Sequence, residues 1–281
     1  MNKLALSDDI LMQVEKPARY IGNEVNIVKK DPEAVSIRFA MCFPDVYEIG
    51  MSHLGIQILY EKFNRRPDVY CERVYSPWPD LSKIMSEKQI PLFALETQDP
   101  IKQFDFLGIT LQYEMCYTNI LQVLDLSQIP LLQKDRGDED PIILGGGPCT
   151  YNPEPIADFF DIFFIGEGEL SYDALFDLYR DMKEGNTYTR DAFLRAACKI
   201  PGIYVPSLYE VTYKEDGTLA SFRPKYEDVP ETVRRMVLIH MDEGEYPMHP
   251  IVPFVKATQD RVVLEIQRGC IRGCRFCHLC R

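Results

Sequence analysis

Short apolar segments alternate with amphipathic segments about five times between residues 35 and 185, and this alternation constrains the fold most. The apolar segments are rich in Val, Ile and Phe and lie between charged residues, prolines or glycines, which predicts strands. The amphipathic segments carry apolar residues at helical spacing. The predicted strands are residues 34–43, 68–77, 91–98, 104–112, 141–147 and 161–169. The predicted helices are residues 52–64, 79–89, 114–129 and 171–185.

Strands that alternate with helices predict an α/β fold, a doubly wound, Rossmann-type parallel sheet with helices on both faces. Ser52 is the expected N-cap of the first helix, and Asp80 or Pro79 is expected to cap the second. Ligands of such sheets bind at the carboxyl ends of the strands. A site is therefore expected among the loops at residues 43–53, 111–116, 145–155 and 166–169.

The alternation of strand-like and helix-like segments ends at about residue 200. Two alternating runs surround "EDG" at residues 215–217, which indicates a hairpin. A further apolar run, "RVVLEIQ", follows a proline-rich stretch and predicts a strand at residues 261–267. These changes predict four parts: an N-terminal extension (1–30), an α/β domain (31–199), a linker with a β-hairpin (200–260) and the start of another domain (261–281).

Composition narrows the range of functions. Asp and Glu number 43 against 31 Lys and Arg, for a net charge of −12, and such a surface repels phosphate backbones, so nucleic-acid binding is not expected. No stretch approaches the roughly 18 apolar residues of a membrane span, and the first residues lack the apolar core of a signal peptide. A cytoplasmic location is therefore expected. There, the nine cysteines are expected to be metal ligands or buried apolar side chains rather than disulfides.

Four of the nine cysteines lie in the last 12 residues of the chain, which ends "EIQRGCIRGCRFCHLCR", and Cys270, Cys274 and Cys277 have Cys-x3-Cys-x2-Cys spacing. Three thiolates on a loop that leaves a strand can converge on one soft metal site. A 4Fe–4S cluster tolerates three protein ligands and leaves one iron open. A four-thiolate zinc site that includes Cys280 is the alternative, but its ligands would be closer together than in the usual paired arrangement.

Glycines flank these cysteines, and an aromatic residue lies between the last two of the three. Gly269 and Gly273 let the backbone wrap closely around a cluster and bring amide N–H groups near its sulfurs. Phe276 directly precedes Cys277 and can cover the edge of a cluster or of a ligand's ring.

A strand followed by Cys-x3-Cys-x2-Cys, with an aromatic residue before the third cysteine, resembles the signature of radical S-adenosylmethionine (SAM) enzymes. The resemblance implies that Cys270, Cys274 and Cys277 hold three irons of a 4Fe–4S cluster in the loop after the first strand of a (β/α) barrel. The fourth iron would bind SAM, with Phe276 near its adenine. Reductive cleavage of SAM would give a 5′-deoxyadenosyl radical, with electrons from a donor such as a flavodoxin or ferredoxin.

The preceding residues resemble the cobalamin-binding-type domain of one branch of radical SAM proteins. The resemblance rests on "FPDVYEIGMSHLGIQILY", "DFLGITLQYEMCYTNIL" and "GGGPCTYNPEPIADFFDIFFIGEGE" and covers roughly residues 15–281, including the cysteine motif. It implies an uncharacterised bacterial family of fused proteins, similar to iron–sulfur oxidoreductases.

The resemblance to corrinoid domains is incomplete at the loop after the first strand. Asp45 is followed by Val and Tyr rather than by the histidine of Asp-x-His-x-x-Gly. His53, eight residues after Asp45, is expected to be solvated or to cap a helix. Gly145, Gly146 and Gly147 either admit the nucleotide tail of a corrinoid or form a tight turn.

The other polar residues of interest have simpler explanations. Glu167 and Glu169 are expected to favour a helix start, and His240 and His249 are expected to be ordinary exposed residues.

A radical SAM barrel needs on the order of 200 residues after its first strand, and four residues follow Cys277. The sequence therefore predicts a fragment, the N-terminal part of a radical SAM enzyme of unknown substrate that would be inactive alone. A corrinoid-binding or scaffolding module without catalysis is the alternative. A methylthiotransferase-like enzyme acting on RNA is disfavoured by the acidic charge and by the lack of a second three-cysteine set in residues 1–200.

Overall fold

A six-stranded sheet forms the centre of the computed structural model, which describes residues 4–241, 246–259 and 261–275. The strand order is β2-β1-β3-β4-β5-β6, with β1 to β5 parallel and β6 antiparallel. The strands are β1 (Ile37–Phe43), β2 (Val69–Tyr75), β3 (Phe106–Thr110), β4 (Ile142–Gly146), β5 (Ile162–Phe164) and β6 (Ile203–Tyr204). The predicted α/β fold is confirmed.

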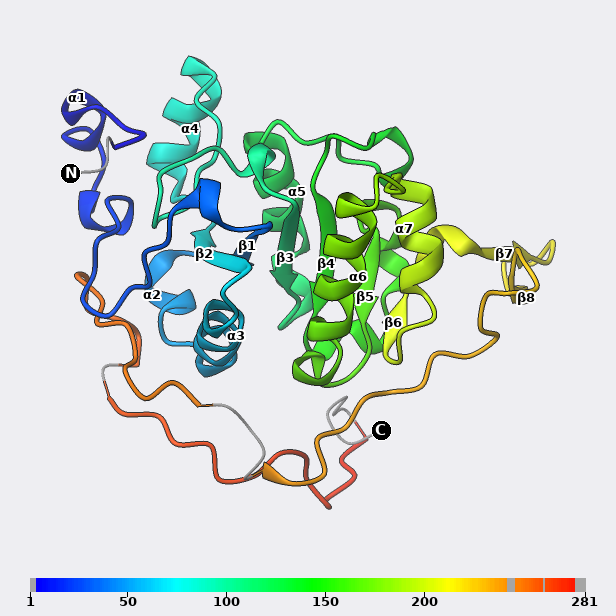
Figure 1. The fold of residues 1–281 in the computed structure, drawn as a ribbon. Coiled ribbons are helices and arrows are strands. Elements are labelled where there is room, and N and C mark those ends of the chain that lie inside the picture. Colours follow the sequence, from blue (N-terminus) through cyan, green and yellow to red (C-terminus); the bar gives the residue numbers. More distant parts are fainter. Residues whose placement is uncertain (1–3, 242–245, 260, 276–281) are drawn as a thin grey trace.

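Helices cover both faces of the sheet (Figure 1). They are α1 (Asp8–Leu11), α2 (Tyr47–Gly50), α3 (Leu54–Arg65), α4 (Pro79–Lys88), α5 (Tyr117–Leu126), α6 (Tyr172–Glu184) and α7 (Arg190–Ala197). α3, α6 and α7 share one face, because aromatic rings from all three contact Phe39 of β1 or Phe106 of β3. α4 and α5 contact each other on the opposite face.

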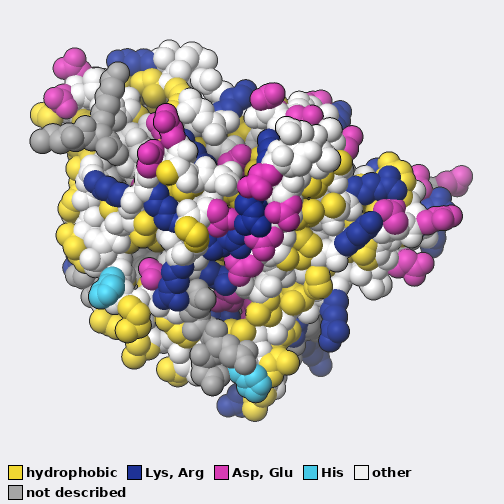
Figure 2. All heavy atoms as spheres, in the orientation of Figure 1, with side chains coloured by type: hydrophobic (Ala, Val, Ile, Leu, Met, Phe, Trp, Pro, Cys, Tyr) yellow, Lys and Arg dark blue, Asp and Glu magenta, His cyan; other side chains and the backbone are white. Residues whose placement is uncertain are grey.

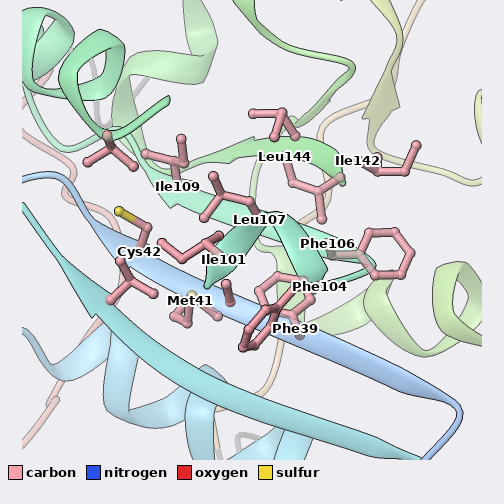
Figure 3. Packing of buried hydrophobic residues seen from close by; sticks show 14 of the residues in the cluster. Phe39, Met41, Cys42, Ile101, Phe104, Phe106, Leu107, Ile109, Ile142 and Leu144 are labelled. Carbon is pink, nitrogen blue, oxygen red and sulfur yellow. The ribbon is translucent and has the colours of Figure 1, made fainter. Parts of the chain in front are cut away.

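The core on the α3 and α6 face is aromatic. Figure 3 shows Phe39 and Phe106 among the buried side chains of the sheet. The ring of Phe39 lies 5.0 Å from that of Phe63 and 6.0 Å from that of Phe106, between ring centroids. Gly108 in β3 makes room for it, since a Cβ there would lie 2.4 Å from the Phe39 ring. These contacts fix α3 and α6 against the strands, and each aromatic pair adds about 0.5–1.5 kcal/mol beyond its buried area.

Charged side chains join α3 and α6 on the outside of this layer. Arg66 Nη2 lies 2.8 Å from Asp68 Oδ2 and 2.6 Å from Asp177 Oδ1 of α6. Figure 2 shows acidic and basic side chains intermixed on the face that it presents.

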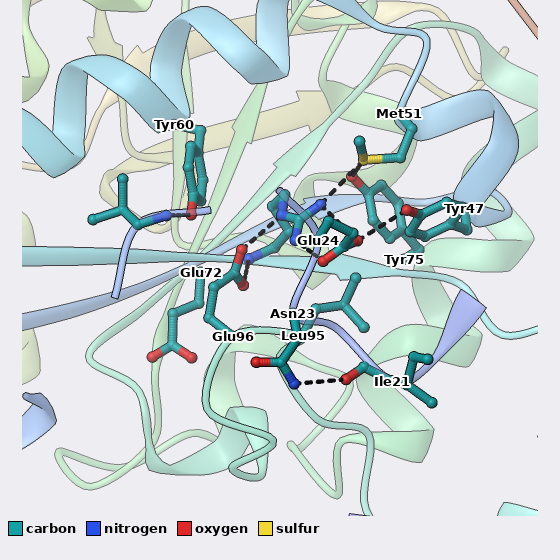
Figure 4. A network of polar contacts seen from close by, with 12 residues as sticks. Ile21, Asn23, Glu24, Tyr47, Met51, Tyr60, Glu72, Tyr75, Leu95 and Glu96 are labelled. Atoms are coloured by element: carbon teal, nitrogen blue, oxygen red, sulfur yellow. Dashed lines mark hydrogen bonds and ion pairs between the residues drawn. The ribbon is translucent and has the colours of Figure 1, made fainter. Parts of the chain in front are cut away.

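The N-terminal segment and residues 91–98 contact the edge strand β2 through a buried network around Arg73. Figure 4 labels its partners Glu24 and Glu96. Arg73 Nη2 donates to Glu24 Oε2 over 2.8 Å, and Arg73 Nε donates to Glu96 Oε1 over 2.6 Å. Tyr47 Oη also donates to Glu24. The network gives a buried guanidinium two carboxylate partners, which the desolvated charge requires.

Two predicted strands are absent. Residues 91–98 instead fold back in a turn, in which Ala94 N donates to Asp99 O and Gln98 has a φ of 67°. This turn places Glu96 against Arg73, so tertiary pairing overrides the local strand pattern. Residues 261–267 form no strand because no described residue pairs with their backbone.

Two predicted helix starts are wrong by one residue or more. His53, not Ser52, is the N-cap of α3, and the Ser52 hydroxyl donates to Glu48 O instead. Trp78 is the N-cap of α4, with Pro79 as its first helical residue, where proline's missing N–H costs nothing.

The predicted hairpin is present as β7 (Tyr209–Tyr213) and β8 (Leu219–Pro224), paired antiparallel. Beyond it, the described residues between 233 and 269, here called the strap, run beneath the sheet as drawn in Figure 1. Met236 pairs with Gly166 after β5, Val252 N donates to Val25 O, and Thr258 N donates to Glu48 O. None of the helices in the described parts of the chain has the length and apolar character that a membrane crossing requires.

Candidate functional site

A cavity of about 360 Å³ lies at the carboxyl ends of β1, β3, β4 and β5, between α3 and α6. The strand order reverses between β1 and β3, and ligands of open α/β sheets bind at this switch point. Most of the lining is apolar, including Met41, Ile58, Ile109, Phe164 and Tyr172. The cavity is called the crevice below. It lies where the sequence predicted a site.

The crevice contains an unsatisfied buried hydroxyl. Thr110, the last residue of β3, is 9% exposed, and its Oγ1 has no hydrogen-bond partner among the described residues. A buried hydroxyl without a partner costs about 1–3 kcal/mol. A bound molecule with a polar atom in the crevice can supply the missing hydrogen bond.

The three predicted glycines have different roles. A Cβ on Gly145 would collide with the Phe163 ring at 2.6 Å, so this glycine serves packing. Gly147 has a φ of 111° and forms the turn after β4. Gly146 lines the crevice, and no atom lies within 4 Å of the position its Cβ would take. Gly146 and Gly147 line the crevice and Gly145 does not.

His53 lines the crevice as a capping residue. Its Nδ1 accepts a hydrogen bond from Ile56 N over 3.3 Å at the start of α3. Burial lowers the pKa of His53, and its contact with Gln112 partly offsets that effect. The neutral ring therefore serves the helix start, which agrees with the capping role expected for it.

Acidic residues and one arginine form the mouth of the crevice. Arg268 Nη1 donates to Glu169 Oε2 over 2.7 Å, and Arg268 Nη2 donates to Glu169 Oε1 over 2.9 Å. Glu265 Oε2 accepts from the same guanidinium over 2.9 Å, and Glu167 accepts from Leu238 N of the strap. The expectation that Glu167 and Glu169 only favour a helix start missed these partners, because 99 residues separate Glu169 from Arg268.

The cysteine motif follows this mouth directly. Cys270 and Cys274 are exposed and free of disulfides, and Arg272 N lies 3.4 Å from Cys270 Sγ as a donor. Gly269 and Gly273 have φ values of 75° and 60°, with no atom near the position of a Cβ. Two free thiols with a backbone N–H directed at sulfur suit a soft metal cluster. The donor set therefore fits the implied iron–sulfur group as far as it is described.

Three predicted residues, Phe276, Cys277 and Cys280, lie outside the described residues. Among the described ones, no three His, Cys, Asp or Glu side chains are grouped to hold a metal ion. His240 and His249 are exposed, as expected. Four scattered cysteines are buried, namely Cys42, Cys71, Cys116 and Cys198, and Cys149 is partly buried.

The chain is similar in sequence to known proteins. The chain is 26% identical over 241 residues to "Uncharacterized protein MJ0966" of Methanocaldococcus jannaschii. The match covers 85% of this chain and 40% of the relative, so the chain spans less than half of that protein's length. Residues 55–206, more than half of the chain and most of the crevice lining, match the family described as "Radical SAM proteins, N-terminal". The chain therefore belongs to this family of radical SAM proteins.

Proposed function

We propose that this chain is the N-terminal part of a radical SAM enzyme in which Cys270, Cys274 and Cys277 hold a 4Fe–4S cluster that binds SAM. When bound, the cluster supplies the electron that cleaves the sulfonium of SAM. The observation that carries the proposal is the pair of free thiols, Cys270 and Cys274, on glycine-flanked backbone beside the crevice of a domain from this family. The substrate class is left open by these residues.

The residues of this chain would hold and orient the cluster. Arg272 N–H donates to the Cys270 sulfur, and hydrogen bonds to cluster sulfurs raise the reduction potential of such centres. Phe276 would cover the adenine of SAM. Residues 261–281 would begin a radical SAM barrel, with residues 1–30, 31–199 and 200–260 as extension, α/β domain and linker.

Residues 261–267 form no strand in the described structure, but their exposed apolar side chains support the proposal that they would form the first strand against further barrel elements. Val262, Leu264 and Ile266 are 86%, 79% and 86% exposed. They occupy alternate positions, which is the pattern of one face of a strand. Exposed apolar side chains at that spacing suit burial against further barrel elements.

The proposed enzyme would work in the cytoplasm. It would receive electrons from a donor such as a flavodoxin or ferredoxin.

Anaerobic reconstitution of the full chain with iron and sulfide tests the proposal. We expect about four irons per chain and the broad visible absorbance of a 4Fe–4S cluster. Both should be lost when Cys270, Cys274 and Cys277 are replaced by Ala together. Cys280→Ala is the matched control and should keep the iron. Iron retained in the triple variant, or stoichiometric zinc that is lost in Cys280→Ala, would overturn the assignment.

A corrinoid in the crevice is the second candidate, favoured by the open Gly146 position and the unsatisfied Thr110 hydroxyl. Without a histidine in the Asp45 loop, binding would depend on the nucleotide tail inside the crevice. Gel filtration of the chain with cobalamin should then leave a retained red chromophore. Gly146→Leu, which fills the crevice, should abolish retention. If wild type retains no chromophore, the domain acts as a scaffold.

A further inference from the structure

We propose that Arg268 is a positioning residue: it fixes the cysteine segment on the α/β domain through Glu169, so that Cys270 lies at the mouth of the crevice. This inference deepens the proposed function. Only the part that concerns the cluster rests on the proposed function. The anchoring itself is a property of the chain without metal.

The anchor is a two-point contact. Both Nη atoms of Arg268 donate to the two carboxylate oxygens of Glu169, at 2.7 and 2.9 Å. The planar guanidinium matches a carboxylate in this geometry and fixes orientation as well as distance, which a lysine ammonium cannot do. The side chains of Arg268 and Glu169 are 16% and 17% exposed, so solvent screens the pair only partly.

The same cation also lies close to two further carboxylates. Glu265 Oε2 lies 2.9 Å from Arg268 Nη2, and Glu167 Oε2 lies 3.7 Å from Arg268 Nη1. Removal of Arg268 would leave three carboxylates facing one another across the mouth of the crevice, and their repulsion would open it.

No other side chain duplicates this anchor in the described part of the cysteine segment. Among the described residues from 261 to 275, Arg268 makes every hydrogen bond and ion pair that reaches the α/β domain. The previous contact along the strap is Gln259 N to Ser52 Oγ, at 3.0 Å. The placement of residues 261–270 therefore depends on Arg268.

Arg268 is only two residues from Cys270, so its contact with Glu169 also restricts where Cys270 can lie. Two residues of extended chain span at most about 7 Å, so the Cα of Cys270 lies within about that distance of the Cα of Arg268. Arg268 and Glu265 both line the crevice. The crevice and the cysteine segment therefore share residues, and the first predicted cluster ligand lies two residues beyond Arg268, which lines the crevice.

A double-mutant cycle on the full chain without metal tests the anchor. Thermolysin cleavage before Leu264 and Ile266, followed by mass spectrometry, reports how freely this segment leaves the domain. We expect Arg268→Ala and Glu169→Gln each to raise the cleavage rate several-fold, and the double variant to cleave no faster than the faster single variant. Arg268→Lys keeps the charge but not the two-point geometry of the guanidinium. Its cleavage rate should therefore lie between those of the wild type and Arg268→Ala.

Arg261→Ala is the control, because it removes an exposed cation from the same segment. It should leave the cleavage rate unchanged. Independent effects that multiply in the double variant, or single variants that cleave at the wild-type rate, would overturn the proposal.

Iron release to a chelator separates the anchor from the proposed function. In reconstituted protein, Arg268→Ala and Glu169→Gln should lose iron several-fold faster than Arg261→Ala. If neither the wild type nor any variant takes up iron, the proposed function fails. The cleavage cycle then still tests whether Arg268 anchors the segment. If wild type binds a cluster and the cycle shows no coupling, the anchor fails and the function stands.

Discussion

Arg73 in β2 donates to both oxygens of Glu96, from its backbone N over 2.7 Å and from Nε over 2.6 Å, in an interior where both side chains are at most 1% exposed. Arg73 also contacts Glu24 of the N-terminal segment. One buried cation therefore joins three segments that lie far apart in the sequence, and the backbone of its strand is occupied at the sheet edge, since Leu95 N donates to Arg73 O.

Loss of this cation should destabilise the domain strongly. Arg73→Met removes the guanidinium that pairs with the buried carboxylates of Glu24 and Glu96, and breaking a buried pair from one side costs about 3–5 kcal/mol. Urea denaturation followed by far-UV circular dichroism measures the change. Arg180→Met, which removes a more exposed ion pair with Asp68, should cost less than about 1 kcal/mol. Equal losses in the two variants would show that the buried network contributes no more than a surface pair.

The neighbouring Glu72 should make stability depend on pH in an unusual direction. Burial, opposed by Arg38 and reinforced by Glu96, raises the pKa of Glu72 from 4.5 to about 7. Between these values the folded protein binds more protons at Glu72 than the unfolded chain does, so stability falls as pH rises through this window. Glu72→Gln should remove this slope, measured as the difference between the two proteins' free energies of unfolding from pH 4.5 to 7.5. Parallel pH profiles would contradict the assignment to Glu72.

Two glycines on the neighbouring strands β3 and β4 should respond differently to the same substitution. Gly108→Ala places a Cβ 2.4 Å from the Phe39 ring and should cost about 1–3 kcal/mol through overpacking. Gly146→Ala meets no atom within 4 Å and should be neutral or stabilising by up to about 1 kcal/mol, because alanine restricts the unfolded chain. Thermal denaturation compares them. A larger loss in Gly146→Ala would mean that the crevice is filled in solution.

The sequence predicted much of the sheet because periodicity reflects burial. Five of the six predicted strands through residue 169 are present as β1 to β5, because apolar runs of that length must be buried on both faces of a parallel sheet. Residues 91–98 carried the same pattern, but the fold uses Glu96 to satisfy Arg73, a partner 23 residues away that no local rule reveals. Pairing between distant residues is invisible to spacing.

The candidate site divides in the same way. Its position at the carboxyl ends of the strands followed from topology, and the glycines of residues 145–147 were visible as a run. Neither the role of Thr110 nor the contact of Arg268 with Glu169 was predicted, because a threonine that ends a strand and an arginine before a cysteine are common. What distinguishes them is the absence of a partner for Thr110 Oγ1 among the described residues and the two-point contact of Arg268, both of which are three-dimensional facts.

Thr110 should therefore contribute to ligand binding at a cost in stability. Thr110→Val replaces the hydroxyl by a methyl group of similar size, and removing an unsatisfied buried polar group should raise the free energy of unfolding by about 1 kcal/mol. Thr150→Val is the matched control: Thr150 is 1% exposed, and its Oγ1 donates to Gly147 O over 2.8 Å, so its loss should cost about 1 kcal/mol. Urea denaturation of both variants measures whether each substitution raises or lowers the free energy of unfolding. Opposite changes in the free energy of unfolding would identify the Thr110 hydroxyl as a group that does not serve folding. A lower free energy of unfolding in both variants would show that Thr110 has a partner in solution, such as a water molecule. The crevice would then need no ligand to satisfy this hydroxyl.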